Sequence, residues 1–197
     1  MRNRVGGLFV AAGLLLILGA MLLYLHNVRE NRDADENAQL VLQEMQTQLV
    51  TPVPVPDATP SPRPEKTEMP VVEIDGREYI GYVAVPALEI KLPVMADWSY
   101  EKLRIAPCRH AGATYTHDLV IAAHNYDSHF GGLKDLYEGA AVTFTDMDGD
   151  VFTYAVSRVE TVAPTAVAEV LESDSDLVLY TCTYGGKTRV VVYCNEA

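Results

Sequence analysis

The sequence is poor in basic residues and in cysteine, and each shortage argues against a class of function. It has 15 lysine and arginine residues against 27 aspartate and glutamate residues, which gives a formal net charge of −12 at pH 7. An acidic surface repels a phosphate backbone, so nucleic acid is not expected as a partner. The three cysteines are an odd number and cannot all pair within the chain. At least one thiol is therefore free or pairs elsewhere, which argues against a purely structural disulfide framework.

Nucleotide-binding motifs and internal repeats are also missing. The chain contains no G-x-G-x-x-G pattern and no P-loop pattern. Its composition, with 49% hydrophobic and 21% charged residues, is typical of a folded globular protein.

A long uncharged run opens the chain. Residues 5–25 contain no charged side chain, and at ~1.5 Å per helical residue they can cross a bilayer core of ~30 Å. Arg2 and Arg4 precede the run, so residues 1–4 are predicted to form a cytoplasmic tail and the remainder to lie outside the cell. A cleaved signal peptide is the alternative, but the run exceeds the ~7–15 apolar residues of such signals. We therefore expect a single-pass membrane protein anchored by residues 5–25.

Residues 26–70 have the pattern of a stalk and linker. Leu40, Val41, Met45 and Leu49 follow a roughly helical spacing, which predicts a short helical stalk. Seven of the eleven prolines fall in residues 51–70, which predicts an extended, semi-rigid spacer. The folded domain is therefore expected over residues 71–197, which is enough chain for one core.

This domain is predicted to be mostly β. Segments of strand length, rich in β-branched and aromatic residues, lie at 79–85, 90–94, 119–123, 141–144, 151–156, 177–180 and 189–193. Asp148-Gly149 and Gly185-Gly186 are hairpin signals. Short helical turns are expected at 98–105, 132–137 and 165–171. Closely spaced strands with hairpin turns favour a small barrel or sandwich over a βαβ fold.

Three residues at predicted strand ends suggest nucleophilic chemistry. Cys182 ends one strand, and Arg189 opens the next strand across a tight hairpin. A cation beside a thiol lowers the thiol pKa and could neutralise an oxyanion on a substrate. His124 closes the apolar strand 119–123, where an imidazole can exchange a proton near neutral pH. Taken singly, a strand cysteine is more often a packing residue and a strand-end histidine a surface residue.

Taken together, these segments resemble the sortase family. Residues 178–182, Val-Leu-Tyr-Thr-Cys, resemble the sortase T-L-x-T-C signature, with Val178 in place of the leading threonine. Residues 119–125 resemble the strand that ends in the sortase histidine, and residues 130–136 are similar to the F-x-x-L-x-x-L stretch after it. The resemblance extends over residues 79–193.

The resemblance implies a closed eight-stranded β-barrel with short helices and a cysteine transpeptidase activity. Cys182 would attack an LPXTG-like sorting signal after its threonine, His124 would act as acid and base, and Arg189 would stabilise the oxyanion. Thr181 would contact substrate. The resulting thioacyl-enzyme would be resolved by an amine from a cell-wall precursor or a pilin lysine. Val178 and the short loop after Cys182 leave the subclass open among classes A, B and D.

Other residues are also candidates. The histidines His110, His117 and His129 compete with His124, and His129 is predicted to be a solvated loop residue. A disulfide between Cys108 and Cys194 is chemically possible outside the cell. No cofactor is expected, although calcium is an alternative at two acidic stretches, of which the first is predicted to be a turn. The first stretch is residues 146–150. The second comprises Glu169, Glu172, Asp174 and Asp176 and is predicted to be a solvated loop.

Two other functional classes remain open from the residues alone. One is a different extracellular cysteine peptidase or cross-linking enzyme. The other is a non-catalytic β-domain held on an anchored stalk, which predicts that Cys182, His124 and Arg189 are dispersed or buried apart.

Overall fold

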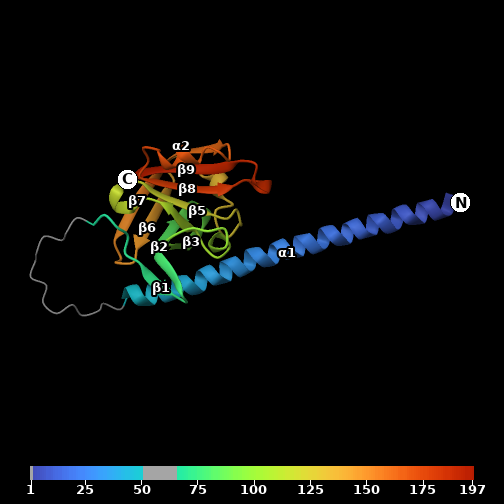
Figure 1. Ribbon diagram of the computed structural model, residues 1–197, viewed down its shortest axis with the longest axis horizontal. Coiled ribbons are helices and arrows are strands. Elements are labelled where there is room, and N and C mark those ends of the chain that lie inside the picture. The colour runs from blue at the N-terminus through green and yellow to red at the C-terminus, as the bar shows by residue number, and fades with distance from the viewer. Residues whose placement is uncertain (1, 51–65) are drawn as a thin grey trace, which may run out of the picture. The chain divides into compact units, whose positions relative to one another are not determined.

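The computed structural model describes residues 2–50 and 66–197, so most of the predicted proline-rich spacer lies outside the described residues. The chain divides into two compact units, Met1–Asp33 and Ala34–Ala197. The first unit is helical and belongs to α1 (Arg2–Val50), drawn in blue in Figure 1. By length and composition, α1 is the one helix among the described residues that could cross a membrane.

The second unit is built on a closed β-barrel (Figure 1). Its eight strands run in the order β2-β3-β4-β5-β8-β9-β7-β6, and β6 pairs back with β2. The short strand β1 (Val72–Ile74) adds to the start of β2. The barrel strands are β2 (Arg77–Val85), β3 (Ile90–Met95), β4 (Cys108–Ala111), β5 (Leu119–Ala123), β6 (Ala141–Asp146), β7 (Val151–Val162), β8 (Leu177–Cys182) and β9 (Arg189–Glu196). The predicted closed eight-stranded barrel is therefore confirmed.

Short helical segments connect the strands. They are η1 (Pro86–Leu88), η2 (Lys102–Arg104), η3 (Thr114–Thr116), η4 (Leu133–Asp135), α2 (Val167–Leu171) and η5 (Tyr184–Gly186). Three of them, η2, η4 and α2, lie within the turns expected from the sequence. Strands β1 and β4 were not predicted, since each is only three or four residues long.

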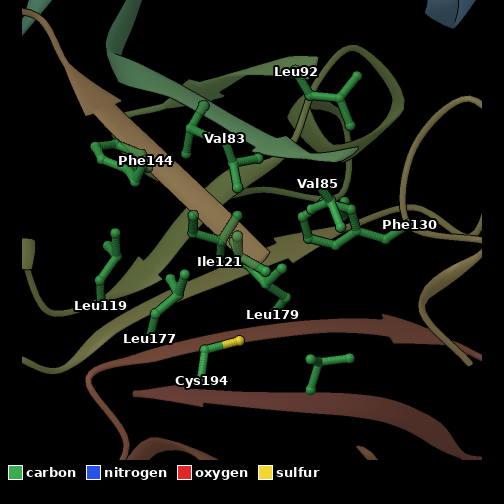
Figure 2. Close-up of a cluster of buried hydrophobic side chains, with 14 of the residues drawn as sticks. Val83, Val85, Leu92, Leu119, Ile121, Phe130, Phe144, Leu177, Leu179 and Cys194 are labelled. Atoms are coloured by element: carbon green, nitrogen blue, oxygen red, sulfur yellow. The ribbon is translucent and has the colours of Figure 1, made fainter. Parts of the chain in front are cut away.

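Alternating side chains fill the barrel interior. Successive strand residues point to opposite faces, and in β8 this sends Leu177 and Leu179 into the core. They belong to the same buried cluster as Ile121 of β5 and Phe144 of β6, which Figure 2 shows. Val178 faces outward from β8 and is buried beside Val170 of α2, outside the barrel interior.

The β6–β7 hairpin is closed by an aspartate. The Oδ1 atom of buried Asp146 accepts hydrogen bonds from the backbone N–H groups of Asp148 and Asp150, each at 2.9 Å. Gly149 has φ of 84°, a conformation that glycine adopts without strain. The hairpin turn predicted at Asp148-Gly149 is therefore confirmed.

The last part of α1 packs against the barrel. Four residues on one helix face are buried, namely Ala34, Ala38, Leu42 and Met45. Met45 lies in a cluster with Ile74, Tyr79 and Met95. The helix predicted from the spacing of Leu40, Val41, Met45 and Leu49 is present, since α1 runs to Val50, but Leu40 is 66% exposed and does not face the barrel. At 3.6 residues per turn, positions 34, 38, 42 and 45 share a face from which position 40 points away. The unit that contains the barrel thus begins at Ala34 and includes residues assigned from the sequence to the stalk.

Candidate active site

The ends of three neighbouring strands form the candidate site. Strands β5 and β8 run parallel, with Ala123 opposite Thr181, so His124 and Cys182 follow at the same edge of the barrel. Strands β8 and β9 run antiparallel, and Cys182 is the direct partner of Arg189. Directly paired residues have Cα atoms ~4.5–5.5 Å apart, and neighbouring strands lie ~4.8 Å apart. The fold therefore brings the three residues singled out from the sequence to one place.

A tight hairpin holds Arg189 opposite Cys182. The backbone N–H of Thr183 donates to the carbonyl of Thr188 at 3.0 Å, and the two threonine hydroxyls are 2.8 Å apart. Gly185 and Gly186 have φ of 75° and 69°, as the chain reversal requires. Nη1 of Arg189 donates to the carbonyls of Gly186 and Thr188, each at 3.1 Å. These bonds fix the guanidinium at the rim, beside the strand end that carries Cys182.

Cys182 is the only cysteine with an exposed surface. Cys108 and Cys194 are fully buried, whereas Cys182 is half-buried, and all three thiols are free. Burial raises the pKa of Cys108 and that of Cys194 to about 12, so both stay protonated at neutral pH. The disulfide considered between them is not formed in this structure, where they lie in different clusters. Nucleophilic chemistry, which needs an accessible thiolate, is thereby restricted to Cys182.

This difference in burial predicts selective alkylation. Iodoacetamide should modify the folded chain once, at Cys182, and modify all three cysteines in denaturant, because reagent reaches the buried thiols only on unfolding. Peptide mapping by mass spectrometry locates the adduct. Early labelling of Cys108 or Cys194 in the folded chain would contradict the burial described here.

His124 begins the loop that follows β5. Its Nδ1 lies 3.1 Å from the amide oxygen Oδ1 of Asn125. When Nδ1 donates to this oxygen, Nε2 is the nitrogen that exchanges a proton with a reacting group. The imidazole also stacks on the ring of Tyr126, with 4.2 Å between centroids and 12° between planes.

The other histidines have different environments. His129 is completely buried, so the expectation of a solvated loop residue is wrong. The loop turns inward there because the next residue, Phe130, is a core side chain. Nδ1 of His110 lies 2.7 Å from the hydroxyl oxygen of Tyr180, and Nδ1 of His117 lies 3.4 Å from Oδ1 of Asp176. None of these three is placed at the shared strand edge.

Thr181 connects the strands that carry the cysteine and the histidine. It is buried, and its hydroxyl donates to the carbonyl of Ala123 at 2.9 Å. This bond joins the residue before Cys182 to the residue before His124. A substrate contact by Thr181 stays a prediction, whereas its cross-strand bond is a contact that sequence reasoning did not anticipate.

An apolar hollow adjoins Arg189. It is lined by Tyr180 and Arg189 and by residues from the end of β7 through α2, namely Val162, Ala163, Ala166, Val167 and Val170. Tyr180 and Cys182 are two residues apart on β8 and therefore point to the same face. Sequence reasoning missed this hollow, although the apolar residues of 162–170 were a signal for it. Such a surface suits an apolar side chain of a peptide.

One group of carboxylates is close enough to share an ion among the described residues. It consists of Asp146, Asp148 and Asp150 in the β6–β7 turn. The ammonium of Lys66 lies 2.6 Å from Asp148 Oδ2 and 2.7 Å from Asp150 Oδ2. These bonds raise the pKa of Lys66 above its ordinary value, so a lysine supplies the positive charge at this turn. The acidic residues near α2 form no such group in the described part of the chain.

Comparison with known proteins agrees with this geometry. The family model described as the sortase domain matches residues 83–197, more than half of the chain. The chain therefore belongs to the sortase family, as its motifs suggested. No curated protein matches it.

Solved sortase structures share the fold. Sortase C1 from Streptococcus agalactiae is 25% identical, with a TM-score of 0.56, and the match covers 64% of this chain and 70% of that one. Sortase C-1 from Streptococcus pneumoniae is 27% identical, with a TM-score of 0.54 over 64% of this chain and 69% of that one. A sortase D5 transpeptidase from Clostridium perfringens, at 16% identity and a TM-score of 0.53 over 60% and 79% of the chains, shows the fold alone.

Proposed function

We propose that the chain is a transpeptidase that cleaves an LPXTG-like sorting signal after threonine and transfers the acyl group to an amine. The observation that supports this most is the strand register, which brings Cys182, His124 and Arg189 to one barrel edge. A non-catalytic domain gives no reason for this convergence. The apolar hollow beside Arg189 offers a surface for the apolar residues of the signal.

The chemistry follows from the positions of the three side chains. The Cys182 thiolate attacks the threonine carbonyl carbon, and the negative charge that moves to the carbonyl oxygen is stabilised by Arg189. When the C–N bond breaks, protonated His124 gives its proton to the leaving amine. An acceptor amine then attacks the thioester and loses a proton to His124. The C–S bond breaks, and the Cys182 thiolate and the imidazolium are restored.

The membrane arrangement belongs to the same proposal. Residues 1–4 form a cytoplasmic tail, residues 5–25 span the membrane, and residues 26–70 form an extracellular stalk and linker whose helical part from Ala34 packs on the barrel. The catalytic domain of residues 71–197 lies outside the cell. Secreted proteins with C-terminal sorting signals reach such a domain as they emerge. The acceptor is the amine of a cell-wall precursor or of a pilin lysine.

The test uses the full chain in detergent micelles with a panel of LPXTG-like peptides, with and without an amine acceptor. Mass spectrometry should show a thioacyl adduct on Cys182 and an amide-linked product that forms only when the amine is present. Peptide hydrolysis at the same rate with and without amine would indicate a peptidase instead. A folded chain with an alkylatable Cys182 but no adduct across the panel would reject the proposal.

A further inference from the structure

Tyr126 makes the closest aromatic contact to the candidate catalytic histidine. Its ring lies parallel to the imidazole of His124, with 4.2 Å between centroids and 12° between planes. We propose that Tyr126 is a positioning residue that holds the His124 ring in its reactive orientation. This role rests on the transpeptidase function proposed above. Tyr126 does not touch the reacting atoms in this role but acts through His124.

Backbone hydrogen bonds within the loop hold the segment that carries Tyr126. The carbonyl of Tyr126 accepts hydrogen bonds from the N–H groups of His129 at 3.0 Å and Gly131 at 2.9 Å. The carbonyl of His124 accepts one from Phe130 at 3.2 Å, and the Phe130 side chain is anchored in the barrel core. A Cβ atom at Gly131 would lie 2.8 Å from the Tyr126 carbonyl oxygen, so the close approach depends on glycine. These contacts hold the backbone of Tyr126, from which its ring projects, in one position.

The ring of His129 packs against the ring of Tyr126. The two rings are 5.5 Å apart at 59°, and His129 is completely buried. Neither ring nitrogen of His129 makes a hydrogen bond of normal geometry with a described residue. Burial first, and the nearby charge of His124 second, lower the pKa of His129 to about 4, so this ring is neutral at physiological pH. His129 therefore packs against Tyr126 and does not act as a second acid or base.

The support continues to the helix that precedes the barrel. The backbone of Ala34 lies beside the His129 ring, and Ala34 is itself buried. The line of contacts runs from Ala34 through His129 and Tyr126 to His124. The residues that follow the membrane anchor are thus connected to the imidazole by direct packing.

The stack and the Asn125 contact restrain different features of His124. The parallel ring limits rotation of the imidazole, and its electron-rich face favours the charged imidazolium. Asn125 Oδ1 selects the proton on Nδ1. In the proposed reaction the imidazolium donates to the leaving amine, so loss of the stack should reduce kcat more than it changes KM.

The experiment compares Tyr126→Leu with Tyr126→Phe in the full chain in detergent micelles. NMR of the His124 ring should show a ring-current shift that Leu removes and Phe retains. The His124 titration midpoint should fall by about half a unit in Tyr126→Leu, because the stacked ring that favours the imidazolium is lost. The kcat should fall about 2- to 5-fold in Tyr126→Leu with little change in KM, and Phe should restore most of it. Tyr137→Leu, which removes a 64% exposed tyrosine, is the matched control.

The NMR result separates this inference from the proposed function. An unchanged His124 titration and ring shift in Tyr126→Leu would overturn the positioning role, whether or not the chain is a transpeptidase. A changed titration in a chain that forms no thioacyl adduct would support the stack and reject only the reaction. Tyr126 is half-buried on a loop, and Tyr126→Gln is a second replacement should Leu prevent folding.

Discussion

Replacing Cys182 with alanine is expected to lower amide product formation by at least ~10³-fold, because the proposed reaction has no other nucleophile. Alanine is smaller than cysteine and fits a half-buried strand end without strain. The fold should therefore persist, and the thioacyl adduct should disappear from mass spectra of the chain incubated with peptide. Both the rate and the adduct are measured on the full chain in micelles.

Cys108→Ala is the matched control for this variant. Cys108 is fully buried on β4, and burial raises its pKa to about 12. Its loss should cost about 1 kcal/mol of stability and leave the activity per folded molecule unchanged. If Cys182→Ala kept its activity while Cys108→Ala lost it, the assignment of the nucleophile would be wrong.

Met45→Asp is expected to lower the free energy of unfolding of the barrel unit by about 3 kcal/mol. Met45 has no exposed surface and packs with Ile74, Tyr79 and Met95, so aspartate would lose these contacts and place a carboxylate among apolar groups. Urea unfolding of the full chain in micelles, followed by the fluorescence of the single tryptophan, Trp98, measures the loss.

Leu40→Asp is the matched change on the exposed face of the same helix. Leu40 is 66% exposed, so this substitution should change the free energy of unfolding by no more than about 0.5 kcal/mol. Equal losses in the two variants would show that the helix does not dock through Met45. A large loss only in Met45→Asp would show that residues before the linker stabilise the barrel, and that a soluble fragment beginning at residue 71 lacks part of its packing.

The strands and the main turns could be predicted from the sequence because their signals are local. The period-two pattern of β8 and the glycines of the hairpin before Arg189 depend only on neighbouring residues. The apolar run of residues 5–25 is likewise defined by composition. Strand β4 escaped prediction because four residues are too few to show a period.

The candidate site could be predicted in part because its residues stand at strand ends in recognisable motifs. Cys182, Arg189 and His124 were named from the sequence, and the strand register places them at one edge. The expectation for His129 failed. A loop histidine has no local signal that tells whether another segment will cover it.

The sequence by itself determined a β-rich domain that follows an apolar helix, the strand-end positions of the candidate catalytic residues and the sortase resemblance. Each of these depends on a short-range pattern. Only the tertiary structure decided which rings surround His124, which thiols are shielded and which helix face meets the barrel. Tyr126, His129 and Ala34 come together because the loop closes on itself and a distant helix packs over it. Contacts between segments far apart in the chain depend on how the whole domain packs, so residue spacing along the chain does not predict them.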